Sequence, residues 1–477
     1  MRSLEVPGKQ EGVMHTGPQK VYFVGIGGIG MSGIAEVLLT LGYSVFGSDL
    51  SQSETTERLT QRGATIAFGH DADRITPDID AVVISSAVRY ANPEVARARD
   101  LHIPVIPRAE MLAELMRMKT GIAVAGTHGK TTTTSLLASI LTEAGLDPTV
   151  VIGGKVHSLD SNARLGQGDL IVAEADESDG TFLLLSPTVA VVTNIDREHL
   201  DHYGDVDKAV EAFCEFINRI PFYGRAVLGI DSPRVRALLP RVRKRFLTYG
   251  LSPDAEITAR DLKIDGFSTS FIAMHGSQEL GRVSLGMPGR HAAQNALATI
   301  GVSIELGVPF ETCVEALGNF GGVQRRFEVR GAVGGITVVD DYGHHPEEIR
   351  ATLRAAREGF GRRLVVAFQP HRFSRTRDLH EDFLDAFDDA DVLFLTDVYA
   401  AGEEPIAGVS GEALAGALER RGHVDVSFVG PCGELSRRIA EVAEPDDLVL
   451  LLGAGDIVRF GDEVLAGLKT RALRAVR

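Results

Sequence analysis

Cysteine is scarce in this sequence, and long apolar segments are absent. The three cysteines among 477 residues are Cys214, Cys313 and Cys432, and their spacing matches neither a metal site nor a disulfide framework. No stretch approaches the roughly 20 apolar residues of a membrane span, and the polar start of the chain has no apolar segment of signal-peptide length. We therefore predict a cytoplasmic protein with reduced thiols and no membrane partner, whose residues 1–18 form a disordered leader.

A net positive charge is lacking as well. The formal net charge is −16, with the carboxylates spread along the chain, which argues against nucleic acid as a partner. The same balance is compatible with phosphate ligands, because backbone N–H groups and a few lysines bind phosphate locally. Apolar residues make up 44% of the chain and charged residues 24%, as in ordinary globular proteins, and 477 residues are too many for one hydrophobic core.

Short apolar runs alternate with helical patterns through the whole chain, which is typical of parallel sheets covered by helices. We expect an α/β fold with three domains, spanning residues 19–118, 119–325 and 326–477. Within the middle domain, residues 255–285 have the pattern of an antiparallel meander. The expected strands span residues 21–25, 44–48, 81–85, 120–125, 170–174, 189–194, 337–341, 363–369, 392–397 and 448–453.

A glycine-rich motif follows the first expected strand. It has the form G-x-G-x-x-G, runs from Gly25 to Gly30, and leads into a helix-like segment. Glycines let the backbone approach a pyrophosphate, and the helix N-terminus supplies unpaired N–H groups. Asp49 ends the next strand, where an acidic group can bind a ribose hydroxyl. The pattern predicts a Rossmann-like N-terminal domain, but it does not distinguish a dinucleotide from a UDP-sugar, and a glycine turn can also serve helix packing alone.

A second glycine motif, Gly126-Thr127-His128-Gly129-Lys130-Thr131-Thr132, lies between a buried strand and a helix. The backbone amides of such a loop surround the β- and γ-phosphates of a nucleotide, while Lys130 adds a positive charge and the Thr131 hydroxyl can bind Mg²⁺. Val124 stands where the usual P-loop has its first glycine, so this is a shortened variant. The motif predicts a P-loop-type central ATPase domain.

Acidic residues and a histidine follow the next two strands. Glu174 ends the strand at 170–174, where a carboxylate can bind Mg²⁺ beside a P-loop. The acidic run that continues through residues 176–179 is either part of the same site or a solvated loop. His199 lies just beyond the strand at 189–194, and it is either a ligand of a second metal ion or a surface residue.

Polar clusters also follow three strands of the last, Rossmann-like domain. Residues 340–346 read Asp-Asp-Tyr-Gly-His-His-Pro, residues 369–377 contain His371, Arg372, Arg375 and Arg377, and a third loop begins at Asp397. Guanidinium groups bind carboxylates in bidentate fashion, and the carboxyl ends of parallel strands share one edge of a sheet. The clusters therefore predict an anion-binding crevice, unless the arginines form only a solvated basic surface.

These motifs, in this order, resemble those of the Mur ligases, and in particular their alanine-adding branch. They are the glycine fingerprint, Gly-Thr-His-Gly-Lys-Thr, Glu-Ala-Asp-Glu-Ser-Asp, Asn-Ile-Asp with a following His-Leu-Asp, and Asp-Asp-Tyr-Gly-His-His-Pro. The resemblance extends from about Val21 to the end of the chain. It implies that ATP phosphorylates the lactyl carboxylate of UDP-N-acetylmuramate, that the amine of L-alanine attacks the acyl phosphate, and that the product enters peptidoglycan synthesis. We expect a monomer or weak homodimer.

The resemblance also implies roles for single residues. Those expected at the metals are Thr131 and Glu174 for a first Mg²⁺ and His199 for a second. Those expected at ATP are Gly126, Thr127, His128, Gly129, Lys130, Thr131, Thr132, His291, Asn295, Arg326 and Asp341. Those expected at the UDP-sugar are Gly25, Gly27, Gly28, Ile29, Gly30, Asp49 and Ser86. Those expected at the amino acid are Tyr342, His344, Arg372 and Arg375. Lys130, Glu174, His199, His344, Arg372 and Arg375 are the expected catalytic set.

One position departs from the wider family. Several Mur ligases that act later carry a lysine, modified to a carbamate, shortly after the His-Leu-Asp segment. Residues 209–218 contain no lysine here, only Glu211 and Glu215, so Glu215 is a candidate for a natural carboxylate in that place.

Three other functions agree with parts of the sequence. A recycling ligase that attaches a whole tripeptide to the same sugar acid would share the first two domains, but residues 371–375 resemble the alanine-adding enzyme. A nicotinamide-dependent dehydrogenase would use the first glycine motif and leave Lys130 and Thr131 without a role. A non-catalytic nucleotide-binding regulator would not need Lys130, Glu174 and His199 together.

Overall fold

The computed structural model describes residues 19–85, 87–89, 91–117, 119–152, 163–164, 166–422 and 425–475. The expected leader over residues 1–18 and the predicted UDP-sugar residue Ser86 lie outside the described residues. Within the described part of the chain, no helix is both long and apolar enough to cross a membrane.

The N-terminal sheet has five parallel strands in the order β3-β2-β1-β4-β5. Alternate residues of β1 point into two different apolar clusters, with Val21 and Phe23 on one face and Tyr22 and Val24 on the other. Both faces are therefore covered, as the Rossmann-like prediction requires. Its elements are β1 (Lys20–Val24), α1 (Ile29–Thr40), β2 (Ser44–Asp49), α2 (Glu54–Gln61), β3 (Thr65–Phe68), β4 (Ala81–Ile84), α3 (Pro93–Asp100), β5 (Val105–Pro107) and α4 (Arg108–Arg117).

The central sheet has ten strands in the order β15-β14-β13-β12-β11-β10-β6-β9-β7-β8. The predicted meander is confirmed, since β13, β14 and β15 pair antiparallel. Its strands are β6 (Thr120–Ala125), β7 (Thr149–Val151), β8 (Ala163–Arg164), β9 (Leu170–Glu174), β10 (Val189–Val192), β11 (Arg225–Gly229), β12 (Phe246–Tyr249), β13 (Ile257–Asp265), β14 (Ser268–His275) and β15 (Gln278–Leu285). Its helices are α5 (Lys130–Glu143), α6 (Leu200–Tyr203), α7 (Val206–Asn218), α8 (Pro233–Leu238), α9 (Arg290–Glu305) and α10 (Phe310–Gly318).

The C-terminal sheet has six strands in the order β16-β17-β21-β18-β19-β20, and only β16 runs antiparallel to its neighbour within this described sheet. Its strands are β16 (Glu328–Val333), β17 (Ile336–Asp341), β18 (Leu364–Phe368), β19 (Val392–Thr396), β20 (Val426–Gly430) and β21 (Leu448–Leu452). Its helices are α11 (Pro346–Phe360), α12 (Phe373–Asp378), α13 (His380–Leu384), α14 (Gly411–Arg421), α15 (Leu435–Val442) and α16 (Gly461–Ala475).

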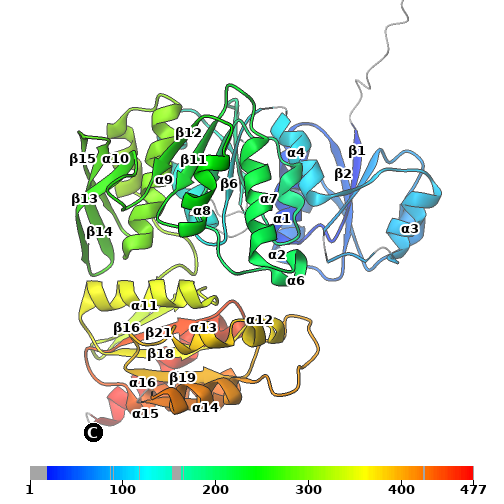
Figure 1. Ribbon diagram of the computed structural model, residues 1–477. Coiled ribbons are helices and arrows are strands. Elements are labelled where there is room, and N and C mark those ends of the chain that lie inside the picture. Colours follow the sequence, from blue (N-terminus) through cyan, green and yellow to red (C-terminus); the bar gives the residue numbers. More distant parts are fainter. Residues whose placement is uncertain are drawn as a thin grey trace, which may run out of the picture.

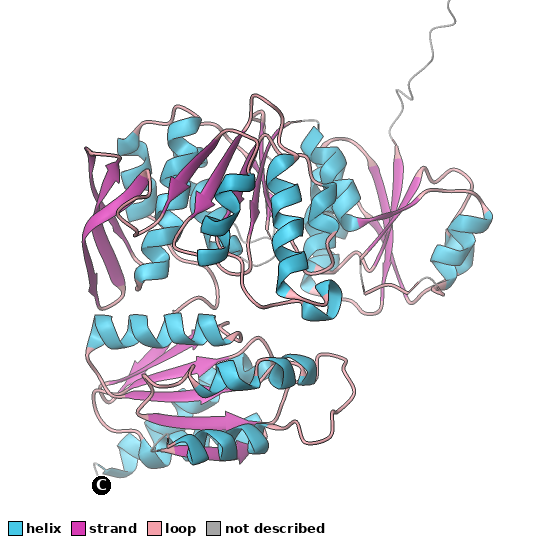
Figure 2. Cartoon of the chain, viewed as in Figure 1, coloured by secondary structure: helices cyan, strands magenta, loops and turns pink. Residues whose placement is uncertain are grey.

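The three domains are joined in two different ways (Figure 1). One apolar cluster continues from the N-terminal sheet, at Phe23, into the central sheet, at Ala123. The C-terminal domain has two clusters of its own, and it lies against the central domain with α11 facing it (Figures 1 and 2). All ten expected strands are present with ends within two residues, and the predicted three-domain α/β fold is confirmed.

Candidate active site

The central glycine loop connects β6 to α5, between the neighbouring strands β9 and β10. Gly126 and Gly129 have φ angles of +132° and +80°. A Cβ atom at Gly126 would lie 2.0 Å from Oγ1 of Thr193, and one at Gly129 would lie 2.7 Å from Oδ1 of Asn295. Both positions therefore require glycine, for backbone conformation and for space.

Side chains that follow β10 hold this loop in place. The backbone N–H of His128 donates to Oδ1 of Asn194 at 2.8 Å, and Oγ1 of Thr193 donates to the His128 carbonyl at 2.6 Å. The backbone N–H of Asp196 donates to Oγ1 of Thr127 at 2.9 Å. The Asn-Ile-Asp motif thus supports the loop backbone, a role that the sequence did not indicate.

Lys130 is bound by its own loop and by one buried acid. Its Nζ donates to the carbonyls of Gly126 at 2.6 Å and Thr127 at 3.1 Å, and it lies 2.8 Å from both carboxylate oxygens of Glu177. Burial alone would lower the pKa of Lys130, but the charges of Glu177 and Glu174 outweigh burial and raise it. Glu177 is only 2% exposed, so the solvated-loop interpretation is wrong at this position.

The pair expected to bind the first Mg²⁺ is in contact. Oγ1 of Thr131 lies 3.1 Å from each carboxylate oxygen of Glu174, because β9 runs parallel beside β6 and brings both to one sheet edge. A hydroxyl and a carboxylate are oxygen donors of the kind that Mg²⁺ prefers, so the residues present fit this ion.

His199 lies next to Glu177, the acid that pairs with Lys130 of the loop. Its Nε2 is 3.7 Å from Oε1 of Glu177, and burial lowers the pKa of its ring, which favours the neutral form that can bind a metal. Glu215 does not join this group. It lies on the exposed face of α7 and pairs with Arg219 at 2.5 Å, whereas Glu177 is the acid beside His199.

A cavity of about 440 Å³ lies between the glycine loop, the start of α9 and the C-terminal domain. Burial lowers the pKa of His291 to about 4, so its ring is neutral. Asp341 reaches the cavity wall, but its carboxylate already accepts hydrogen bonds from the backbone of Phe327 and Gly343, each at 2.8 Å. Seven of the residues expected at ATP line the cavity: His128, Gly129, Thr132, His291, Asn295, Arg326 and Asp341.

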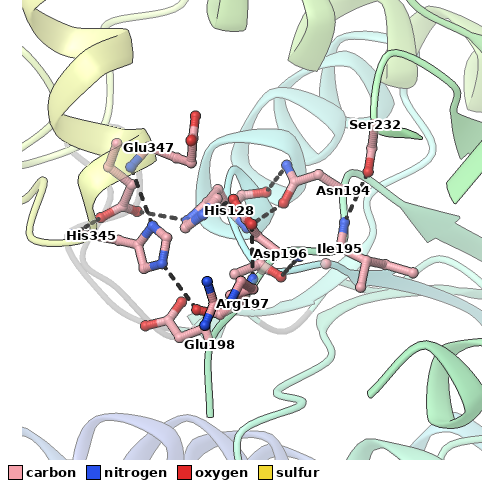
Figure 3. Close-up of polar contacts among 12 residues, drawn as sticks. His128, Asn194, Ile195, Asp196, Arg197, Glu198, Ser232, His345 and Glu347 are labelled. Atoms are coloured by element: carbon pink, nitrogen blue, oxygen red, sulfur yellow. Dashed lines mark hydrogen bonds and ion pairs between the residues drawn. The ribbon is translucent and has the colours of Figure 1, made fainter. Parts of the chain in front are cut away.

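His128 joins the glycine loop to the C-terminal domain (Figure 3). Its ring nitrogens lie 3.6 Å from Asp196 and 3.5 Å from Glu348 of α11, and its ring centre is 4.6 Å from that of His345. Burial would lower the pKa of His128, but Asp196 and Glu348 raise it to about 10. His128, His345 and Glu198 offer ligand atoms within 4.8 Å of one another.

The expected arginine clamp begins after β18. Nη2 of Arg375 lies 2.9 Å from Oε1 of Glu198, which belongs to the central domain. Arg372 and Arg375 line a small cavity of about 40 Å³ together with Glu198 and His199. Arg377 turns away and pairs with Asp378, so only two of the three predicted arginines converge.

Two further predicted residues lie next to the clamp. His344 Nε2 is 3.9 Å from Oε1 of Glu198. The partly exposed ring of Tyr342 lies beneath the guanidinium groups of Arg325 and Arg326, at 5.0 and 5.4 Å from the ring centre. The structure therefore brings His344 to the clamp, while Tyr342 packs on Arg325 and Arg326, the second of which lines the cavity of about 440 Å³.

In the N-terminal domain, the carboxylate of Asp49 holds the glycine loop by a hydrogen bond. The backbone N–H of Gly27 donates to Oδ2 of Asp49 at 2.7 Å. A cavity of about 750 Å³ opens beside the loop and is lined by Gly25, Gly27, Gly28 and Asp49. The predicted fingerprint thus forms a ligand-sized cavity, and one Asp49 oxygen fixes the glycine turn.

Arg108 lies over the third glycine of the fingerprint, and it is not among the residues expected from the sequence. A Cβ atom at Gly30 would be 2.8 Å from Nη1 of Arg108, so this glycine leaves room for the guanidinium group. Nη2 of Arg108 lies 3.5 Å from Oδ2 of Asp176. A cavity of about 240 Å³, lined by Gly28, Gly30, Arg108, Glu174 and Asp176, extends from the N-terminal loop to the predicted metal ligand.

Comparisons with known proteins agree with this geometry. Three family models match the chain in order: Mur ligase family, catalytic domain, over residues 20–120; Mur ligase middle domain, over residues 124–303; and Mur ligase, glutamate ligase domain, over residues 325–455. The UDP-N-acetylmuramate--L-alanine ligase of Geobacter sp. (strain M21) is 59% identical over 452 residues, which are 94% of this chain and 98% of that protein. The protein of the same name from Myxococcus xanthus (strain DK1622) is 59% identical over 454 residues, or 95% and 96% of the two chains.

Solved structures give the same result. The crystal structure of the UDP-N-acetylmuramate-alanine ligase from Thermotoga maritima matches with a TM-score of 0.77 and 30% identity, covering 96% of this chain and 100% of that one. A murein peptide ligase from Psychrobacter arcticus 273-4 shares the fold, with a TM-score of 0.67 and 24% identity over 94% of this chain and 99% of that one. Relatives of nearly equal length and three family models in the expected order show that the chain belongs to the Mur ligase family.

Proposed function

We propose that this chain joins L-alanine to the lactyl carboxylate of UDP-N-acetylmuramate, with conversion of ATP to ADP and phosphate, during peptidoglycan precursor synthesis. The relatives at 59% identity bear the name of that reaction. The observation that carries the proposal is the cavity lined by Gly28 and Gly30 at one end and by Glu174 at the other. It gives a sugar acid held by the N-terminal loop a path to the phosphate-binding loop.

In the first step, the carboxylate of the sugar acid attacks the γ-phosphorus of ATP, and the bond to ADP breaks. Lys130 is fixed by loop carbonyls and Glu177, so its charge is already placed for the phosphate chain. Thr131 and Glu174 would hold one Mg²⁺ and His199 a second, and such ions neutralise the charge of the transferred phosphoryl group. The protein's own contribution is therefore positioning and electrostatic stabilisation.

In the second step, the amine of L-alanine attacks the acyl carbon, and phosphate leaves with the electrons of its bond to that carbon. Direct condensation is slow because oxide is a poor leaving group, whereas an acyl phosphate offers phosphate. Arg372 and Arg375 supply guanidinium groups for the carboxylate of the amino acid, and their small cavity lies at the junction of the central and C-terminal domains.

The test is a coupled assay of ADP release by the purified protein. Release should require UDP-N-acetylmuramate and L-alanine together, and ATP turnover indifferent to either substrate would contradict the proposal. With an oxygen-18-labelled lactyl carboxylate, one labelled oxygen should pass into the released phosphate, because that oxygen bridges to phosphorus in the intermediate. Phosphate without label would exclude an acyl phosphate.

A further inference from the structure

An ion pair between two domains occupies the centre of the arginine clamp. Glu198 comes from the loop after β10, Arg375 comes from α12, and the two groups are 2.9 Å apart. Their side chains are only 10% and 13% exposed, so the pair is largely removed from water. The carboxylate of Glu198 thus lies on the guanidinium group that the proposed function assigns to the carboxylate of the amino acid.

A substrate with a carboxylate alone could not replace this pair without loss. Binding it to Arg375 would leave the buried carboxylate of Glu198 without its main partner, which is strongly unfavourable. A free amino acid carries both a carboxylate and an ammonium group. Its carboxylate can take the place of Glu198 on Arg375, and its ammonium group can take the place of Arg375 on Glu198, so every buried charge keeps a partner.

We propose that Glu198 binds the α-ammonium group of the incoming amino acid, so that Glu198 and Arg375 form the two ends of a seat for a zwitterion. This inference rests on the proposed ligation of an amino acid. It names a substrate-binding residue in the central domain, whereas the clamp residues expected from the sequence all belong to the C-terminal domain. The seat is therefore complete only when the two domains are together.

The surroundings of the seat favour the same assignment. Nδ1 of His344 faces two acceptors, the carbonyl of Tyr342 at 3.0 Å and Oε2 of Glu348 at 3.4 Å, so this nitrogen carries the proton. The lone pair is then on Nε2, which lies 3.9 Å from Oε1 of Glu198. An ammonium group bound to Glu198 has this nitrogen within reach. One N–H bond of the ammonium breaks, an Nε2–H bond forms, and the amine keeps the electron pair with which it attacks.

The backbone at the cavity is strained on both sides. His199 and Arg372 are not glycines, yet they have φ angles of +56° and +69°, and both line the small cavity with Glu198. Residues in this conformation persist only where their surroundings fix them, and they concentrate at ligand sites. For Arg372 the fixing contact is a hydrogen bond from its backbone N–H to the Tyr399 carbonyl at 2.8 Å.

The test compares the wild-type enzyme with the variant Glu198→Gln. Glutamine keeps the size of the side chain but cannot pair with an ammonium charge, so the KM for L-alanine should rise about 10- to 100-fold. The KM values for ATP and UDP-N-acetylmuramate should change less than about twofold. Propionate, which has the carboxylate but no ammonium group, should inhibit the variant more strongly than the wild type, because Glu198 no longer competes for Arg375.

The exposed acid Glu381 of α13 provides the matched control, since Glu381→Gln makes the same change outside the cavity. Thermal unfolding and UDP-N-acetylmuramate binding report whether each variant is folded. An unchanged or lower KM for L-alanine in Glu198→Gln would overturn the inference, and so would equal weakening of L-alanine and propionate. Absence of alanine-dependent ADP release in the wild type would instead overturn the proposed function.

Discussion

The two glycine loops of this protein follow the central strands of neighbouring domains and are held in opposite ways. In the N-terminal loop, the N–H of Gly27 is bound by the carboxylate of Asp49. In the central loop, the neutral side chains of Thr193 and Asn194 hold the backbone, and Lys130 adds a positive charge that is largely removed from water. Similar glycine spacing therefore serves two purposes. The first loop presents an acid suited to a ribose hydroxyl, and the second presents a cation suited to a phosphate chain.

The largest expected effect is that of Lys130→Ala, which removes the charge that distinguishes the central loop. We expect kcat for ligation to fall by about 10²- to 10³-fold, because an electrostatic contact to the transferred phosphoryl group is lost. UDP-N-acetylmuramate binding, measured by calorimetry, should be retained. A parallel loss of that binding would show that the two loops are not independent sites.

A substitution of Asp49 tests the N-terminal loop, as Lys130→Ala tests the central loop. Asp49→Ala frees the N–H of Gly27, and the KM for UDP-N-acetylmuramate should rise about 3- to 10-fold while the KM for ATP is unchanged. Steady-state kinetics with each substrate varied in turn would measure both values. An effect on ATP alone would reverse the assignment of the two loops.

Gly129→Ala tests whether the central loop needs glycine for space as well as for conformation. Gly145, at φ +71°, has nothing within 4 Å of an added Cβ, so Gly145→Ala supplies the conformational cost alone. That cost is about 1–2 kcal/mol of unfolding free energy. Gly129→Ala should lower the unfolding free energy by more than this amount, because its added Cβ meets Asn295, and it should also raise the KM for ATP. Equal losses by chemical denaturation would show that the loop can widen.

The smallest expected effect is a change of domain closure with pH. We expect it only from the central loop, because His128 of that loop contacts the C-terminal domain. The ion pairs of His128 need a protonated ring, whose pKa is raised from 6.5 to about 10. Their contribution to domain closure is complete below about pH 6.5 and is lost as the pH rises through about 10. Small-angle scattering should show a modest expansion over that range. The expansion should be weaker in Glu348→Gln, which has already lost one partner of His128.

Much of the fold could be predicted because buried strands leave a local signal. Most of the ten expected strands contain an apolar run, such as Leu364–Phe368 and Leu448–Leu452, and they lie in the sheet interiors. The strands that were missed are mostly short or at sheet edges, such as β5 (Val105–Pro107) and β8 (Ala163–Arg164), where few residues are buried and the pattern is brief. Their pairing depends on neighbours that are distant in sequence.

The candidate site residues could be predicted where they are consecutive in the sequence, as in the loop at residues 126–132. The residues that were missed act across elements, for Glu177 binds Lys130, Glu198 binds Arg375 and Arg108 covers Gly30. No local pattern tells which acid of a run will face which base. Glu215 could have been rejected from periodicity alone, because Ala212, Phe213 and Phe216 form the buried face of α7 and place Glu215 on the other side.

The contact between His128 and Glu348 makes the phosphate-binding loop part of the surface on which the third domain rests. His128 therefore belongs to the loop that we assign to ATP and also takes part in the docking of the C-terminal domain. By thermodynamic reciprocity, if nucleotide binding strengthens docking by some factor, docking must strengthen nucleotide affinity by the same factor. A small molecule that holds His128 and Glu348 apart, both of which line the cavity of about 440 Å³, should then also weaken ATP binding.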